Sequence, residues 1–278
     1  MFSDFNFDKI PLPVFFIFAV IIVLISIQIG KLLGQNIRRK PDHESESSLG
    51  SVIAATLGLL AFMLAFTFGI TEQRYQARKD LLLEEVKAIE TTYLRAQLLR
   101  EPHLTETQSL LRKYVNLRAN YVKEGHYQKK ETFRGLIKDT EIVIGNLWSH
   151  ARALADADRS SEIDALFISS LNNVIEIHKS RATVFQYRIP LVIWIVLYLI
   201  TILSMFTVGY QEGLTGKKKF RIAIVLALTF SIVILLIADL DRGTGIMSVS
   251  QKPLYELQEK LNSQMPPTDA NQLFESNK

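Results

Sequence analysis

The chain has 278 residues, 48% of them hydrophobic and 22% charged, with a formal net charge of +4 and no cysteine. Without cysteine, disulfides, thiolate catalysis and cysteine-ligated metal sites are excluded. The basic residues gather beside apolar stretches, which indicates membrane-flanking charge and not a nucleic-acid-binding face.

Four apolar stretches are long enough to cross a membrane. A helix needs roughly 20 residues to cross a hydrocarbon core about 30 Å thick. Each stretch lacks Asp, Glu, Lys, Arg and His, and the four are residues 10–30, 49–71, 189–211 and 222–238. The first is not a signal peptide, because Asp4 and Asp8 precede it against a single Lys9 and no small-residue cleavage site follows.

The segment between the second and third stretches predicts four water-exposed helices. Pro102 ends the first of them, because proline disfavours helix in the residue before it. Thr105 and Gln108 have the spacing of a capping box and predict the start of the second. The third runs from Phe133 to Leu154, and the fourth starts near Ser160. Their apolar seams are typical of an antiparallel bundle.

We therefore predict an all-α membrane protein with four transmembrane helices and a soluble four-helix bundle inserted between the second and third. The first and last bundle helices continue spans two and three. After span four, Pro253 begins a short amphipathic helix, and from Met265 we expect a mobile tail. The predicted domains are residues 1–71 with a basic loop at 31–48, the bundle at 72–188, spans three and four at 189–242, and a C-terminal part at 243–278.

The two short loops favour one orientation. The first contains Lys31, Arg38, Arg39 and Lys40, and the second contains three lysines at 217–219. The positive-inside rule places such loops in the cytoplasm, so the bundle and both termini face the periplasm. Basic residues also flank the membrane on the bundle side, and a cytosolic bundle stays the alternative.

Span two carries a stripe of small residues along its whole length: Gly50, Ala54, Gly58, Ala61, Ala65 and Gly69. Such stripes let helix backbones approach closely in lipid. The stripe packs either against another helix of the same chain or against its own copies around an oligomer axis.

If copies surround an axis, the neighbouring apolar row can form a hydrophobic constriction that gates a pore. This row consists of Leu59, Phe62, Phe66 and Ile70, and its alternative environments are lipid or a protein core.

Charged residues gather where spans two and four end on the same side of the membrane: Glu72, Arg74, Arg78, Asp239, Asp241 and Arg242. They are candidates for a charged vestibule at a pore mouth, or else for interfacial anchors and local ion pairs.

The absence of ionisable residues within the spans argues against an active transporter but not against a passive pore. The five histidines are scattered, without the spacing of paired metal ligands, and no phosphate-binding glycine loop is present. We expect no metal, no cofactor and no enzymatic activity.

Two sequence segments resemble signatures of a bacterial membrane protein family called bestrophin-like. The first is GLLAFMLAFTFGITEQRYQARKDLLLEEVKAIETTYLRAQLL in and after span two, and the second is DLDRGTGIMSVSQKPLYEL at the end of span four. Gly243 departs from the family pattern, which favours proline after Asp-Leu-Asp-Arg. With the four-span layout, the resemblance covers most of the chain.

The resemblance implies a homo-oligomeric ion channel in the bacterial inner membrane, a pentamer with span two lining the pore. Its partners are then the bilayer, copies of itself and inorganic ions. It also implies a cytosolic helical domain, against the loop charges. The competing hypothesis is a structural or sensory membrane protein whose bundle binds a ligand or partner protein.

Overall fold

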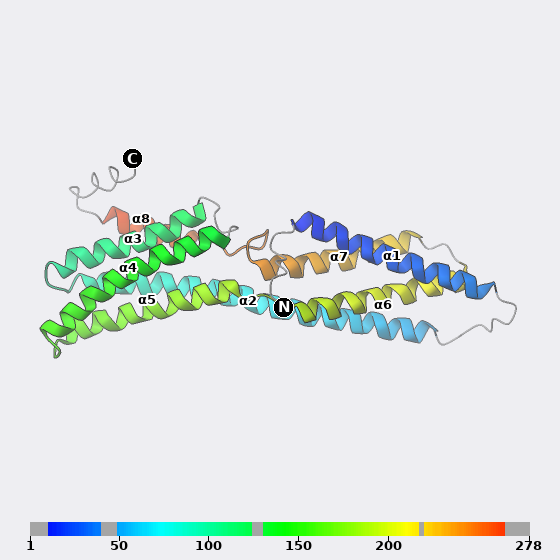
Figure 1. The fold of residues 1–278 in the computed structure, drawn as a ribbon, viewed down its shortest axis with the longest axis horizontal. Coiled ribbons are helices and arrows are strands. Elements are labelled where there is room, and N and C mark those ends of the chain that lie inside the picture. Colours follow the sequence, from blue (N-terminus) through cyan, green and yellow to red (C-terminus); the bar gives the residue numbers. More distant parts are fainter. Residues whose placement is uncertain (1–10, 40–48, 124–129, 217–219, 265–278) are drawn as a thin grey trace. The chain divides into compact units, whose positions relative to one another are not determined.

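The computed structural model describes residues 11–39, 49–123, 130–216 and 220–264, and all regular secondary structure in these ranges is α-helical (Figure 1). The elements are α1 (Leu12–Arg38), α2 (Leu49–Ala96), α3 (His103–Lys123), α4 (Lys130–Ala157), α5 (Glu162–Gln186), α6 (Leu191–Thr215), α7 (Phe220–Arg242) and α8 (Lys252–Ser263). The predicted tail from Met265, the end of the first basic loop and the lysines at 217–219 lie outside the described residues.

The predicted all-helical fold with four candidate spans is confirmed. The helices that are long and apolar enough to cross a membrane lie in Leu12–Arg38, Leu49–Ala96, Glu162–Thr215 and Ala223–Arg242. The third of these segments holds both α5 and α6, and its apolar part is α6.

The chain folds into two compact units, which we call unit 1 and unit 2. Unit 1 comprises residues 1–75 and 188–248, and unit 2 comprises residues 76–187 and 249–278. Helix α2 runs 48 residues without a break, so its first part belongs to unit 1 and its second part to unit 2.

The predicted continuation of the fourth bundle helix into span three is wrong. α5 ends at Gln186, the backbone of Tyr187 is extended, and α6 begins only at Leu191. Pro190 explains the break, because proline has no N–H to donate and keeps the residue before it out of the helical conformation.

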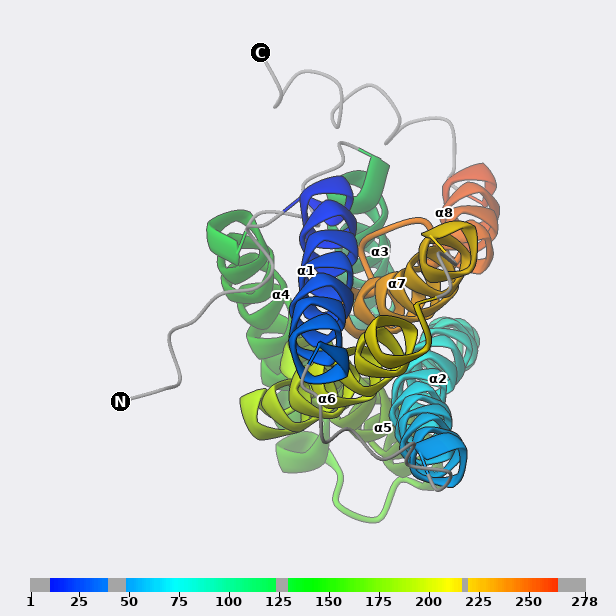
Figure 2. The same ribbon diagram turned by 90° about the vertical axis from the view of Figure 1, so that its right-hand side faces the viewer.

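In unit 1, α1 and α6 pack with their backbones in close contact (Figure 2). A Cβ at Gly209 would overlap the carbonyl oxygen of Ile27, and a Cβ at Gly30 would overlap that of Phe206. Gly34 and Gly213 repeat this arrangement one turn further along. Both helices therefore use a Gly-x-x-x-Gly pattern, the spacing that brings helices together in lipid. None of these four glycines belongs to the small-residue stripe predicted from the sequence.

Two further contacts connect α1 and α6. The Ser26 hydroxyl donates to the carbonyl of Ile202 over 2.6 Å, and Lys31 forms an ion pair with Glu212 at 2.9 Å. An intramembrane hydroxyl bonded to a neighbouring backbone adds stability because hydrocarbon offers it no water.

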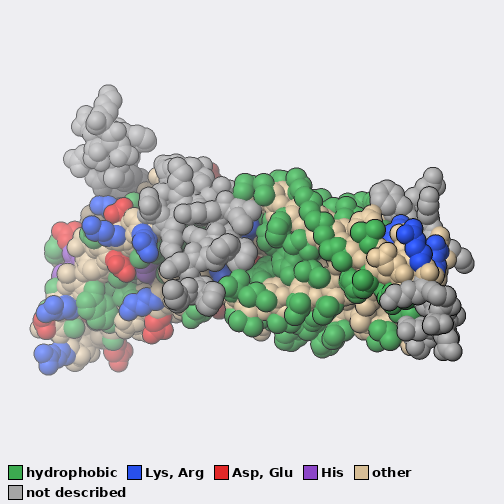
Figure 3. All heavy atoms as spheres, turned by 45° about the vertical axis from the view of Figure 1, so that its right-hand side comes forward, with side chains coloured by type: hydrophobic (Ala, Val, Ile, Leu, Met, Phe, Trp, Pro, Cys, Tyr) green, Lys and Arg blue, Asp and Glu red, His purple; other side chains and the backbone are tan. Residues whose placement is uncertain are grey.

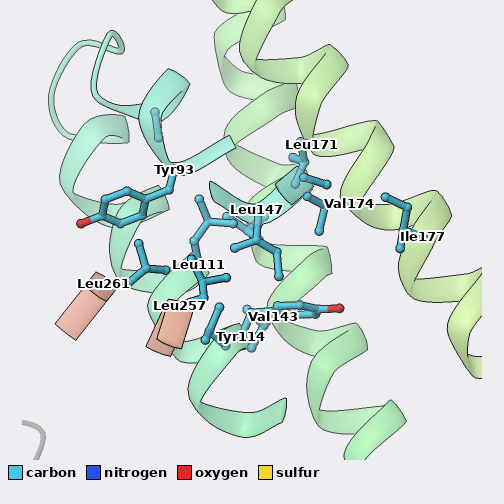
Figure 4. Packing of buried hydrophobic residues seen from close by; sticks show 14 of the residues in the cluster. Tyr93, Leu111, Tyr114, Val143, Leu147, Leu171, Val174, Ile177, Leu257 and Leu261 are labelled. Carbon is cyan, nitrogen blue, oxygen red and sulfur yellow. The ribbon is translucent and has the colours of Figure 1, made fainter. Parts of the chain in front are cut away.

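In unit 2, the second part of α2 shares a hydrophobic core with α3, α4, α5 and α8 (Figure 4). Tyr114, Leu147 and Phe167 are fully buried there. α8 occupies the segment predicted as a short amphipathic helix, and it adds Leu254, Leu257 and Leu261 to this core.

The predicted start of the second bundle helix is wrong by two residues. α3 begins at His103, and the Glu101 carboxylate accepts hydrogen bonds from the backbone N–H and the hydroxyl of Thr105. A carboxylate before the helix thus serves the free N–H of its first turn, so Thr105 does not cap it. α5 does have a serine cap, since the Ser161 hydroxyl accepts from the Asp164 N–H over 3.2 Å.

Candidate functional site

The small-residue stripe of α2 lies on an exposed face of unit 1. All six of its members are exposed: Gly50, Ala54, Gly58, Ala61, Ala65 and Gly69. A Cβ added at any of its three glycines would meet nothing within 4 Å. In the described part of the chain no helix covers the stripe, which contradicts the interpretation that it packs against another helix of the same chain.

The candidate constriction row forms a second exposed face of α2. Leu59, Phe62 and Phe66 are 51%, 63% and 55% exposed, and Ile70 is half-buried. At about 100° per residue, the row lies roughly 110° around the helix from the stripe.

The third face of α2 packs within unit 1. Leu60, Leu64 and Thr67 are buried there, and the Ser204 hydroxyl of α6 donates to the carbonyl of Thr56 over 3.0 Å. Only 17% of the most apolar 18-residue segment of α2 is buried, against 44% of the corresponding segment of α7. This membrane-length helix is therefore held to its own chain by one face, and two apolar faces are left for other partners.

The visible surface of unit 1 is mostly hydrophobic, whereas Lys, Arg, Asp and Glu are spread over the visible surface of unit 2 (Figure 3). A broad apolar surface of this kind suits lipid or other helices, and not water.

Three of the candidate vestibule charges are buried at the end of α7. Asp241 forms an ion pair with Arg74 at 3.1 Å, and it accepts the backbone N–H of Ile189 over 2.9 Å. Asp239 accepts the backbone N–H groups of Ile246 and Met247 at 3.0 and 2.7 Å. These carboxylates thus fasten α2, the start of α6 and the turn after α7 to one another.

Arg242, Glu72 and Arg78 have different surroundings. The Arg242 guanidinium lies 5.8 Å from the centre of the Phe15 ring, a cation–π contact inside unit 1. Glu72 is half-buried, and Arg78 is buried but belongs to unit 2. Among the six candidates, the structure therefore joins Arg74 to Asp241 directly.

The backbone at Gly243 has a conformation that proline, the residue favoured by the family pattern, cannot adopt. Its φ is +65°, in the left-handed region that glycine adopts freely. Proline is fixed near −65° and could not take this conformation, so the turn here differs from one built on proline.

Unit 2 contains a buried cluster of ionisable residues that the sequence analysis missed. The fully buried Glu85 carboxylate accepts a hydrogen bond from the Tyr114 hydroxyl at 2.6 Å and pairs with Arg118 at 3.2 Å. Arg181 pairs with the same carboxylate, and the Tyr114 hydroxyl also lies 2.9 Å from His178 Nδ1. We call these five residues the Glu85 cluster, and they connect α2, α3 and α5.

Electrostatics fix the charge states of this cluster. Burial raises the pKa of Glu85, but the charges of Arg118 and Arg181 and the Tyr114 hydrogen bond outweigh it and lower the pKa to about 2. Burial, together with the Arg118 charge, lowers the pKa of His178 to about 4. At neutral pH the cluster therefore holds a carboxylate, two guanidiniums and a neutral imidazole.

One sequence signal could have revealed this cluster. Glu85 follows Leu82 by three residues and precedes Ile89 by four, so it lies on the apolar seam of its helix. A carboxylate at such a position needs a buried cationic partner.

Comparison with known proteins identifies the family. The model of the family described as bestrophin-like domain matches residues 17–254. None of the curated proteins matches the chain.

Solved structures of a bacterial bestrophin homologue from Klebsiella pneumoniae, each carrying a point mutation, share the fold. One is 13% identical with a TM-score of 0.65 and covers 89% of this chain and 97% of its own. A second is 14% identical with a TM-score of 0.65, covering 89% and 96%. A structure described as a membrane protein is 13% identical with a TM-score of 0.64, covering 90% and 98%.

Proposed function

The chain belongs to the bestrophin-like family, and from that premise we propose that it is a homo-oligomeric ion channel whose α2 helices line the pore. Bestrophins are ion channels and not enzymes, and the four apolar helices fit an integral membrane protein. The observation that carries the proposal is α2 itself, with one face packed on its own chain and two apolar faces exposed.

The three faces of α2 suit a helix beside a rotation axis. A pore-lining helix needs one face toward its own subunit, one toward the neighbouring subunit and one toward the axis. Small residues suit the contact between subunits, because they let backbones approach. The phenylalanine row suits a hydrophobic constriction, which gates by dewetting. We accordingly assign the stripe to the subunit contact and the row to the axis.

In this proposal, the charged residues around Arg74 and Asp241 hold the helices of unit 1 together. Asp241 joins Arg74 of α2 to the backbone just before α6, and Asp239 holds the turn after α7. Glu72 is half-buried and is the member of the predicted vestibule set that we assign to the pore mouth.

The bundle arrangement and the orientation belong to the same proposal. We infer that unit 2 is the extramembrane part, because its helices bury an ionic cluster and expose charge. The loop charges favour a periplasmic unit 2 in the bacterial inner membrane, and the likeness to bestrophins favours a cytosolic one. Alkaline phosphatase fused after Ser263 decides between them, since this enzyme is active only in the periplasm.

Ion flux from liposomes tests the channel. Purified protein is reconstituted and flux is measured with halide and potassium gradients in turn. We expect selective flux in the natural sequence and its loss in Gly69→Trp and Ala65→Trp, which fill the subunit contact. Val225→Trp is the matched control, because Val225 lies on α7, is 62% exposed and plays no part in the proposed pore.

Flux that both α2 variants retain, together with intact assembly, would contradict the proposal. No flux at all under several pH and calcium conditions would favour the second candidate function, a structural or sensory membrane protein. That candidate is supported by unit 2, whose core spans five helices. Under it, the full-length protein retains a defined ligand or partner protein and variants on the surface of unit 2 lose it.

A further inference from the structure

Two histidines that are 47 residues apart in the sequence meet in unit 2. His103 is the first residue of α3, and His150 lies on α4. Their Nδ1 atoms are 3.0 Å apart, and the rings are nearly perpendicular at 82°. The sequence spacing gave no sign of a pair, because only the packing of α3 on α4 brings the two rings together.

A carboxylate on α3 orients one of the two rings. Glu106 Oε2 lies 3.2 Å from His150 Nε2, the ring nitrogen that does not contact His103. A proton on Nε2 satisfies this contact, so the neutral His150 ring presents the lone pair of Nδ1 to His103. A carboxylate behind a histidine in this way is the usual support of a metal-ligating imidazole, since it fixes the tautomer and raises the basicity of the ligand.

We propose that His103 and His150 bind a divalent transition-metal ion through their two Nδ1 atoms, with Glu106 orienting His150. Imidazole suits the late first-row metals, among them nickel, copper and zinc. With metal–nitrogen bonds of about 2.0–2.1 Å, nitrogens 3.0 Å apart subtend an angle of about 95° at the metal. That angle fits neighbouring positions of square-planar or octahedral coordination, which nickel and copper prefer.

Binding requires a tautomer change and no new charge. Without metal, one Nδ1 donates a proton to the other, and the orientation of His150 by Glu106 makes His103 the donor. With metal, His103 carries its proton on Nε2, and both Nδ1 lone pairs turn toward the ion. No group of three or more His, Cys, Asp or Glu side chains suited to a metal occurs in the described part of the chain, so water completes the coordination.

An ion bound at this position should stabilise unit 2. His150 is mostly shielded, with 17% of its side chain exposed, whereas Glu106 is 56% exposed, so solvent reaches the site from one side. The ion would link the beginning of α3 to α4, the two helices that also meet through Leu111 and Leu147 in the core. Because metal binds the folded arrangement and not the unfolded chain, it raises the melting temperature of unit 2.

The experiment is a titration of tag-free, full-length protein in detergent with Ni²⁺, followed by calorimetry and by the thermal melt. We expect one saturable site per chain and a higher melting temperature. His103→Gln and His150→Gln lose both effects, and Glu106→Gln weakens binding roughly 10- to 100-fold, as outer-shell changes do. Helix content is compared in EDTA, so that a folding defect is seen separately.

Two matched controls accompany these variants. Glu101→Gln makes the same chemical change on a carboxylate that bonds Thr105 and neither imidazole, and His126→Gln removes a histidine outside the pair. Both should bind Ni²⁺ like the natural sequence. Absence of saturable binding, or binding that survives both His103→Gln and His150→Gln, would overturn the proposal and leave the pair as a hydrogen bond between neutral rings.

Discussion

The helices of unit 1 and those of unit 2 pack through different kinds of contact. In unit 1, α1 and α6 meet backbone to backbone through glycines, and large apolar side chains such as Phe62 and Val225 point outward. In unit 2, the helices meet through large side chains such as Tyr114 and Phe167, and charged residues cover the outside. This is the difference expected if lipid surrounds unit 1 and water surrounds unit 2, because lipid gives no reason to bury apolar side chains and water gives a strong one.

The two units also differ in how they satisfy buried polar groups. In unit 1, Asp239 and Asp241 bind backbone N–H groups close to the end of α7, and Asp241 also pairs with Arg74. In unit 2, the buried Glu85 carboxylate binds side chains from two other helices. The stability of unit 2 should therefore depend on side-chain charge, and that of unit 1 on close backbone contact.

The largest effect is expected for Glu85→Ala. The substitution leaves Arg118 and Arg181 buried without their carboxylate, which typically costs about 3–5 kcal/mol of unfolding free energy. Fluorescence measures it in a Trp194→Phe background, because Trp148 then reports on unit 2 alone. Glu84→Ala is the control, since Glu84 is the exposed neighbour. Equal stabilities of the two variants would show that the buried pairing contributes nothing.

The second effect is a dependence of the stability of unit 2 on pH. Unfolded His178 takes up a proton near pH 6.5, but folded His178 does so only near pH 4. Between these values the unfolded state binds more protons, so stability falls as pH falls, by roughly 3 kcal/mol at most. Below pH 4.5 the low pKa of Glu85 adds a second loss that continues to about pH 2.

His178→Gln separates the two contributions. This variant should lose the slope between pH 6.5 and 4 and keep the loss at lower pH. The measurement is the denaturant midpoint of Trp148 fluorescence across the pH range. A slope of equal size in the variant would assign the dependence to other groups.

The smallest effect is expected for a glycine-to-alanine substitution within unit 1. Gly209→Ala puts a methyl group against the backbone of α1, and overpacking of this kind costs about 1–3 kcal/mol. Gly58→Ala adds the same methyl group where no atom of the chain lies within 4 Å, so monomeric protein in detergent should not be weakened by it. Thermal melts of Trp194 fluorescence in a Trp148→Phe background compare them. Equal melting temperatures would mean that the two glycine patterns do not differ.

Much of this fold could be predicted from the sequence. Uncharged runs near residues 10–30 and 222–238 predict spans, because length and polarity alone decide whether a helix can cross a membrane. The seam with Leu82 and Ile89 likewise predicts a helix that packs on others.

The partners of each face could not be predicted, because they depend on which helices meet. The glycines of α1 and α6 have the same spacing as part of the stripe on α2, yet only the former are packed in the described chain. His103 and His150 illustrate the same limit, since nothing local relates residues on two different helices. The break before Leu191 could have been predicted, because Pro190 stands directly before it in the sequence.

Single cysteines can test whether the exposed row of α2 faces an ion pathway, as we propose. Because the natural chain has no cysteine, Phe66→Cys and the α7 control Val225→Cys each introduce the only thiol. Liposome flux is measured before and after reaction with charged methanethiosulfonate reagents, and mass spectrometry verifies labelling. We expect labelling to change the flux through Phe66→Cys and to leave the flux through Val225→Cys unaffected. Unchanged flux through fully labelled Phe66→Cys would contradict it.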